Sequence, residues 1–150
     1  MQTETLQATN VASVKEEVLS VSGNDIIVKI GGKETSNRYS VFELSVPPQV
    51  GAGLHIDHDW DEFWHVMEGT FAFNLDGKPI EVSKGGFAHG PKGIPHSFKN
   101  IGESTGKLVM FTTPSGLENF FRSIHRASLP DGIEKETFVK IMRAHQIEPA

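Results

Sequence analysis

Residues 51–69 read GAGLHIDHDWDEFWHVMEG, and residues 85–100 read GGFAHGPKGIPHSFKN. The two stretches together hold five of the chain's seven histidines. His55 and Asp57 are two positions apart in a predicted strand, so their side chains point to the same face. A turn after this strand lets Glu62 return to that face from the next strand. The first stretch therefore supplies one imidazole and two carboxylates to a single face of the predicted fold.

The second stretch places a tight turn directly before a histidine. Pro91, Gly93 and Pro95 restrict the backbone there and present His96 at the start of the following strand. Two imidazoles and two carboxylates that converge on a protein interior form a plausible site for a divalent metal. The sequence therefore predicts four candidate metal ligands, which are His55, Asp57, Glu62 and His96.

Apolar residues alternate with other residues over most of residues 25–113, a pattern typical of half-buried strands. Aspartate and glycine at 76–77 form a turn dipeptide between two of these strands. Short strands with frequent turn signals predict an all-β barrel or sandwich. The residues that share one face of a predicted strand are Ile26, Val28 and Ile30, then Phe42, Leu44 and Val46, then Phe71, Phe73 and Leu75, and finally Leu108, Met110 and Thr112.

After Pro114 the apolar residues recur at helical spacing instead, which predicts a helical cap over residues 114–150. Ser115 and Glu118 have the spacing of a capping box at the start of the first helix. Residues 1–24 are interpreted as an N-terminal arm that is partly disordered or exchanged between subunits. The two expected helical stripes are Leu117, Phe120, Phe121 and Ile124, followed by Phe138, Ile141, Met142 and His145.

These two stretches resemble the motifs of the cupin superfamily. The second cupin motif, G-x5-P-x-G-x2-H-x3-N, is complete between residues 85 and 100. The first motif, G-x5-H-x-H-x4-E-x6-G, matches at His55, Glu62 and Gly69. It departs at its leading glycine, where Gln49 stands, and at its second histidine, where Asp57 stands.

The resemblance implies an antiparallel double-stranded β-helix, the jelly-roll barrel of the cupins, followed by C-terminal α-helices. Residues 113–121, TPSGLENFF, look like the tail of the quercetin-dioxygenase-like branch of small cupins. That branch implies a metal-dependent dioxygenase acting on a small aromatic or enolisable compound. It also implies one divalent ion, Fe, Mn, Ni, Zn or Cu, with Glu62 as a ligand or as a catalytic base. Because one barrel serves many chemistries, the alternative is a ligand-binding cupin that has little or no metal.

Several residues near the motifs have competing interpretations. His58 is the alternative to Asp57, although strand alternation points it outward unless a bulge intervenes. His65 and His89 are predicted to be wall residues near the site. The acidic residues from 57 to 68 have part of the spacing of a calcium loop but lack its central glycine. Five aromatic residues fit either a substrate pocket or plain core, namely Trp60, Trp64, Phe73, Phe98 and Phe111.

The composition narrows the possible partners. The net charge of −5 and the absence of a basic cluster argue against nucleic-acid or anionic-membrane binding. The chain has no cysteine, and its polar first ten residues lack the order of a secretory signal, so we expect a cytoplasmic location. Small cupins commonly pair through sheet edges and N-terminal strands, so the resemblance implies a homodimer. The segment expected to be exchanged contains Val11, Val14, Val18, Leu19 and Val21.

Overall fold

A computed structural model describes residue 8 and residues 16–150. In this part of the chain the strands form two sheets, and every pairing between neighbouring strands is antiparallel. The six-stranded sheet has the order β1 (Val18–Val21), β2 (Asn24–Ile30), β3 (Ser40–Val46), β10 (Gly106–Thr113), β5 (Asp61–Glu68) and β8 (Phe87–Gly90). The five-stranded sheet has the order β11 (Ile147–Pro149), β4 (Gly51–Asp57), β9 (His96–Asn100), β6 (Thr70–Leu75) and β7 (Lys78–Ser83).

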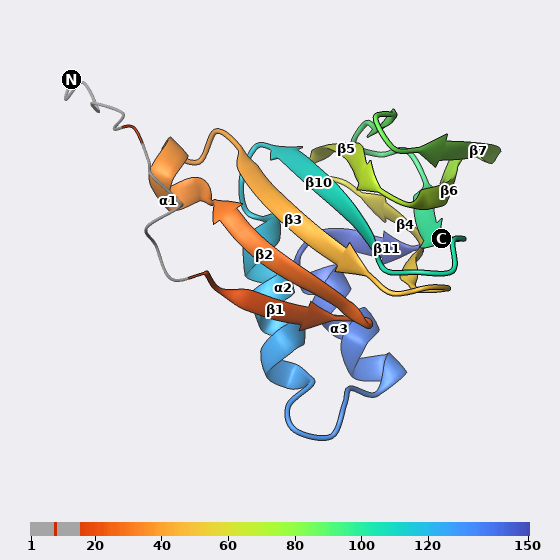
Figure 1. The fold of residues 1–150 in the computed structure, drawn as a ribbon. Coiled ribbons are helices and arrows are strands. Elements are labelled where there is room, and N and C mark those ends of the chain that lie inside the picture. The colour runs from red at the N-terminus through yellow and green to blue at the C-terminus, as the bar shows by residue number, and fades with distance from the viewer. Residues whose placement is uncertain (1–7, 9–15) are drawn as a thin grey trace.

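The predicted all-β fold with C-terminal helices is confirmed, as an antiparallel jelly roll (Figure 1). The helices are α1 (Gly32–Thr35), α2 (Leu117–Ala127) and α3 (Lys135–Ala144). Helix α2 packs against β1 and α3 packs against β11, so the C-terminal helices contact a terminal strand of each sheet. No helix among the described residues is long and apolar enough to cross a membrane.

Strict alternation of burial places the core between the two sheets. In β3 and in β10 every second side chain is buried, as the sequence pattern predicts. Each large apolar side chain buried in this way stabilises the fold by about 1.5–3 kcal/mol. The largest fully buried apolar side chains are Trp64, Phe42, Phe71, Phe73, Leu44 and Leu108.

Only part of the predicted N-terminal arm, residues 1–24, lies among the residues that the structure describes. Val11 and Val14 lie outside the described residues. Val18–Val21 forms β1, which pairs with β2 of the same chain, and Leu19 and Val21 are buried in the core. Subunit exchange through this segment, the homodimer and the domain boundaries at residues 24 and 113 stay predictions.

The predicted capping box at Ser115 is wrong, because tertiary contacts use its glutamate. Helix α2 begins after Gly116, and no side chain caps it. The Glu118 carboxylate is instead 5% exposed and accepts three hydrogen bonds. The donors are the Gly32 N–H at 2.9 Å, the Ser40 hydroxyl at 2.7 Å and the Gly116 N–H at 3.0 Å. Glu118 therefore ties α2 to the start of α1 and to β3.

Glu118→Gln is expected to lower the free energy of unfolding by about 1–3 kcal/mol at pH 7, because it removes charge-assisted hydrogen bonds from a buried site. Burial opposes the charge, but the Ser40 hydroxyl and the N–H donors outweigh it and hold the pKa of Glu118 below its ordinary value of 4.5. The carboxylate's contribution is therefore complete above that value and is lost as the pH falls through the lower folded pKa.

Urea unfolding of parent and variant at several pH values measures this difference. The gap between the two proteins should be largest near neutral pH and should shrink in acid. Glu136→Gln, which changes an exposed acid in the first turn of α3, is the matched control and should leave stability nearly unchanged. A gap that widens as the pH falls would contradict the prediction.

Candidate metal centre

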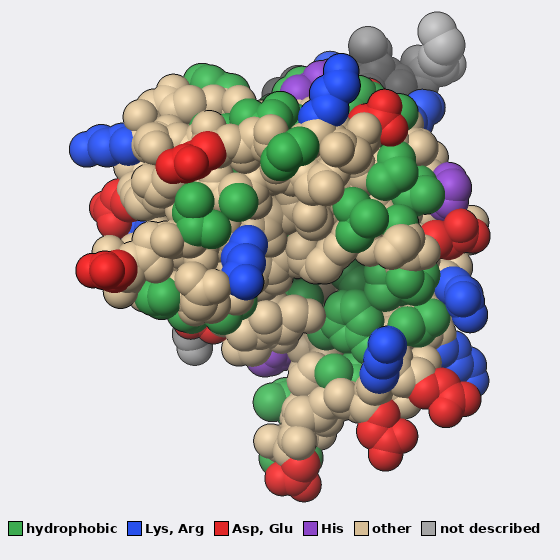
Figure 2. All heavy atoms as spheres, turned by 90° about the vertical axis from the view of Figure 1, so that its right-hand side faces the viewer, with side chains coloured by type: hydrophobic (Ala, Val, Ile, Leu, Met, Phe, Trp, Pro, Cys, Tyr) green, Lys and Arg blue, Asp and Glu red, His purple; other side chains and the backbone are tan. Residues whose placement is uncertain are grey.

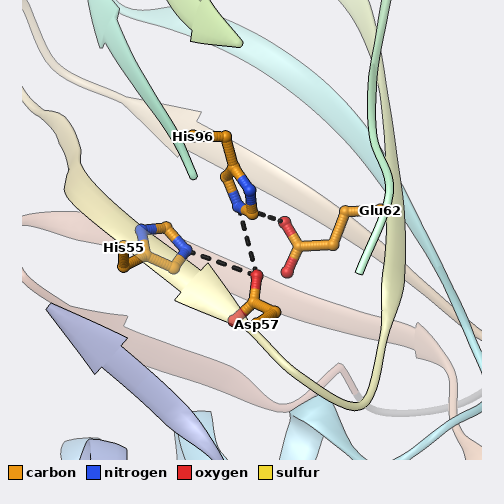
Figure 3. A group of neighbouring side chains, drawn as sticks. All are labelled: His55, Asp57, Glu62 and His96. Carbon is orange, nitrogen blue, oxygen red and sulfur yellow. Dashed lines mark ion pairs between the residues drawn. The ribbon is translucent and has the colours of Figure 1, made fainter. Parts of the chain in front are cut away.

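The four predicted ligand residues come together between the two sheets (Figure 3). His55 and Asp57 lie on β4, and His96 opens β9 as the direct cross-strand partner of His55. Glu62 lies on β5, which belongs to the six-stranded sheet. The short connection between β4 and β5 thus carries the chain from one sheet to the other and brings Glu62 back toward Asp57.

The cluster is compact and almost fully enclosed. Asp57 and His96 are each 1% exposed and Glu62 is 4% exposed. His96 Nε2 lies 3.1 Å from Asp57 Oδ2 and 3.3 Å from Glu62 Oε2, and His55 Nε2 lies 3.4 Å from Asp57 Oδ2. One possible ligand atom from each of the four residues lies within 4.8 Å of all the others, a spacing that a single ion could bridge.

Backbone carbonyls orient both histidine rings toward the centre of the cluster. His55 Nδ1 lies 2.6 Å from the carbonyl oxygen of Gly53, and His96 Nδ1 lies 3.1 Å from that of Ile94. A proton on Nδ1 satisfies each of these contacts and directs Nε2 at the carboxylates, where it can bind a metal once it has lost its own proton. This arrangement of the second ring nitrogen is typical of histidines that bind metals.

The turn before β9 fixes the position of His96 relative to β4. Gly93 has a φ of 79°, a left-handed conformation that glycine adopts without steric cost. Its N–H donates to the carbonyl oxygen of Asp57 at 2.7 Å, which joins the turn to the end of β4. Gln49, which replaces the leading glycine of the first motif, also has a positive φ of 66°. The sequence departs from the motif there, but the backbone keeps a conformation that favours glycine.

The donor set fits a metal, because the ligand atoms have no other hydrogen-bond partners. Both oxygens of Asp57 and the Nε2 of His96 are buried and make no hydrogen bond with any described residue. Buried polar atoms without partners are rare and costly in native proteins. A divalent cation held by these residues would give the cluster the positive charge and the electron-pair acceptor that it lacks. The geometry therefore supports a possible metal site built from His55, Asp57, Glu62 and His96.

The electrostatics of the cluster show how strongly its members interact. Burial opposes charge on His96, but Asp57 and Glu62 outweigh it and raise the pKa of His96 to about 10. Burial, together with repulsion from Asp57, raises the pKa of Glu62 to about 7. The histidines overcome the effect of burial on Asp57 and hold the pKa of that carboxyl well below its usual range. Asp57 is thus the stronger acid of the two carboxyl groups, and Glu62 is the weaker.

The other candidate residues lie away from this cluster. His58 is exposed and lies 3.5 Å from the Glu148 carboxylate, so it points outward as strand alternation predicted. The prediction that His65 and His89 line the site is wrong. Both lie on the outer face of the six-stranded sheet, where His65 stacks on Phe87 and His89 stacks on Phe63. The burial of Glu62, Trp64 and Val66 on β5 already requires His65 to face outward.

A cavity of about 290 Å³ opens beside the cluster, with His55, Asp57 and Glu62 in its wall. Figure 2 shows hydrophobic side chains gathered around a hollow on one face of the molecule. Of the five aromatic residues considered from the sequence, only Phe98 lines this cavity. Trp60, Trp64 and Phe73 belong to the hydrophobic core. Phe111 lies on the outer face of its sheet, where it stacks on Tyr39. Helices α2 and α3 supply walls that were not predicted, including Phe120, Phe121, Phe138 and Met142.

Comparison with known proteins places these features in a family. Residues 42–112 match the cupin domain model. An uncharacterized protein of Methanocaldococcus jannaschii is 30% identical over 77 residues, 51% of this chain and 62% of that protein. A quercetin 2,3-dioxygenase of Bacillus subtilis is 27% identical over 97 residues, 65% of this chain and 28% of the enzyme. The chain thus spans less than two thirds of the length of these relatives.

Comparison with solved structures finds the same fold as the domain match predicts. A predicted oxalate decarboxylase from Thermotoga maritima superposes with a TM-score of 0.62 at 18% identity, covering 72% of this chain and 99% of that one. At this identity the likeness concerns the fold alone. Together with the domain match and the two motifs, it shows that residues 42–112 form a cupin domain and that the described chain has the cupin fold.

Proposed function

We propose that this cupin is a metal-dependent enzyme, a dioxygenase that acts on a small aromatic or enolisable compound. The observation that carries the proposal is the contact between the ligand cluster and the cavity, because three of the four candidate ligands form part of the cavity wall. A substrate in the cavity would therefore touch the metal site directly. The match to a quercetin 2,3-dioxygenase supports the reaction class.

The cavity walls favour an apolar, ring-shaped substrate. They are built mainly from aliphatic and aromatic side chains of both sheets and of α2 and α3. The volume of about 290 Å³ is roughly twice that of an engineered apolar cavity of about 150 Å³ that binds benzene. A molecule with two fused or linked rings fits this space. Its oxygen substituents would face the metal cluster, where His55, Asp57 and Glu62 make the cavity wall polar.

The residues of the cluster would have different roles at the reacting end of the substrate. A divalent transition metal held by the cluster would polarise a substrate oxygen and, if redox-active, support oxidation by O2. Glu62 lies in the cavity wall, so if the metal does not hold its carboxylate firmly, it is placed to take the substrate's acidic proton. Asp57 adds a second negative charge, which would weaken Lewis acidity and favour an oxidised metal relative to a three-histidine site.

A second candidate function follows from the same aspartate. Asp57 stands where the family motif has histidine, and loss of a nitrogen donor weakens binding of the softer divalent metals. A cupin with an empty cluster would still offer the apolar cavity to a ligand. The alternative is therefore a non-catalytic binding protein that holds the same class of molecule.

Metal analysis followed by oxygen-uptake assays separates the two functions. Purified protein should contain close to one equivalent of Fe, Mn, Ni, Zn or Cu, and it should consume O2 with at least one member of a panel of phenolic and diketone compounds. Protein that carries metal but is inactive on the panel would contradict the dioxygenase. Protein that takes up no metal but binds an aromatic compound would favour the binding function.

Filling the cavity should impair catalysis without disturbing the metal. Val139 on α3 lines the cavity and is only partly buried, so a larger side chain at this position can enter the space. Val139→Trp is expected to lower kcat/KM for the active compound by about tenfold or more while metal content stays at the parent level. Val139→Ala, which enlarges the same wall, is the matched control. Equal activity in parent and Val139→Trp would place the substrate elsewhere.

A further inference from the structure

A row of buried polar residues crosses the inner face of the six-stranded sheet at the level of the candidate metal centre. Thr112 on β10 is the cross-strand partner of Ser40 on β3 and of Glu62 on β5, and Glu62 is in turn the partner of Gly90 on β8. Ser40 and Thr112 are fully buried, and Glu62 is nearly so. Neighbouring members of such a row have side chains on the same face, with Cβ atoms about 4.5–5.5 Å apart.

The hydroxyl of Thr112 has no partner in this row. Its Oγ1 is buried and makes no hydrogen bond with any residue that the structure describes. Ser40, on one side, already donates its hydroxyl hydrogen to Glu118. Valine would fill the same volume without the cost of an unpaired hydroxyl, which is about 1–3 kcal/mol in mutational data. The hydroxyl hydrogen of Thr112 therefore needs an acceptor, and none of the described residues supplies one.

Among the described residues, the Glu62 carboxylate lacks a hydrogen-bond donor, just as the Thr112 hydroxyl lacks an acceptor. The described residues donate no hydrogen bond to its carboxylate, and its contact is with His96 Nε2 through Oε2. A carboxylate that binds a metal through one oxygen is normally held by a hydrogen bond to the other. Of the two cross-strand neighbours of Glu62, Gly90 has no side chain, so Thr112 is the neighbour that can donate.

We propose that Thr112 is a positioning residue for the metal centre, whose hydroxyl donates to the non-ligating oxygen of Glu62 when a metal is bound. The inference rests on the metal site of the proposed function. It adds to the site a residue that neither cupin motif contains, because Thr112 lies more than ten residues beyond the end of the second motif at Asn100. The hydrogen bond would fix the carboxylate's rotation and thereby the direction of the oxygen that contacts the metal.

The test measures Ni(II) affinity by competition with a chelator in parent, Thr112→Val and Thr112→Ser. Thr112→Val should lower the affinity by about 10-fold or more, the range found when an outer hydrogen-bond partner of a ligand is removed. Thr112→Ser keeps the hydroxyl and should remain within about twofold of the parent. The thermal unfolding midpoint of metal-free Thr112→Val should not fall, because an unpaired hydroxyl is replaced by a methyl group. A structural role alone would lower stability and affinity together.

A double-mutant cycle shows whether Thr112 acts through Glu62. In a Glu62→Ala background, adding Thr112→Val should change Ni(II) affinity by less than about twofold, since the oxygen that would accept the Thr112 hydrogen bond is gone. Thr113→Val alters the neighbouring residue, whose hydroxyl bonds the Arg38 carbonyl outside the site, and serves as the control. A parent that binds Ni(II) with unchanged affinity in Thr112→Val would overturn this inference alone. A parent that binds no Ni(II), Zn(II) or Mn(II) would overturn the metal centre itself and this inference with it.

Discussion

Replacing His96 by alanine is expected to cause the largest loss of metal affinity of any single substitution in the chain, more than about 100-fold for Ni(II) or Zn(II). His96 is the ligand candidate that lies against both carboxylates, at 3.1 Å from Asp57 and 3.3 Å from Glu62. Its Nε2 is buried and has no hydrogen-bond partner among the described residues. Alanine removes that donor and leaves two buried carboxylates facing each other without a cation.

His58→Ala is the matched control for this experiment. His58 follows Asp57 directly in the sequence, but its side chain is exposed and pairs with Glu148, so its loss should leave metal affinity unchanged. His96→Gln, which keeps more of the buried volume, guards against a failure of His96→Ala to fold. Affinity is measured by competitive chelation after circular dichroism has shown that each variant is folded. Unchanged affinity in His96→Ala together with a loss in His58→Ala would place the site at the surface.

The strands and the ligand residues were predictable because both depend on local spacing. Alternation fixes which residues of β3 and β10 face inward, and the i, i+2 spacing of His55 and Asp57 puts both on one face of β4. The turn through Gly93 has a strong local signal, since glycine there meets a positive φ. These features need no knowledge of the rest of the chain.

The cavity and the role of Glu118 were not predictable, because both depend on how distant segments pack. Phe120 and Phe121 have ordinary helical spacing, which predicts burial but not that the buried face lines a cavity. Ser115 and Glu118 have the spacing of a capping box, yet the carboxylate binds donors on α1 and β3 that are far away in sequence. The outward direction of His65, in contrast, follows from alternation once Glu62 is placed inward.

Asp57→His is expected to increase affinity for Ni(II), Cu(II) and Zn(II) by about tenfold or more, with a smaller gain for Mn(II). The substitution restores the family's set of three histidines and one glutamate, so it exchanges an oxygen donor for the nitrogen donor that these softer metals prefer. Asp57 lines the cavity, which gives the longer imidazole space to extend. Asp57 Oδ2 lies within 3.4 Å of Nε2 of both histidines, so a donor introduced there stays next to both of them.

Asp57→Ala and Asp57→Asn distinguish the effect of losing a ligand oxygen on metal affinity from the effect of losing the negative charge. Alanine removes both and should weaken binding of every divalent metal, although less than His96→Ala does, because His96 supplies the nitrogen donor of the complete second motif. Asparagine keeps one oxygen and the volume but removes the negative charge, so it should weaken Mn(II), which favours carboxylate ligands, at least as much as Ni(II). If all three variants keep the parent's affinity for both metals while His96→Ala loses it, Asp57 is no ligand and serves only to hold the two histidines in place.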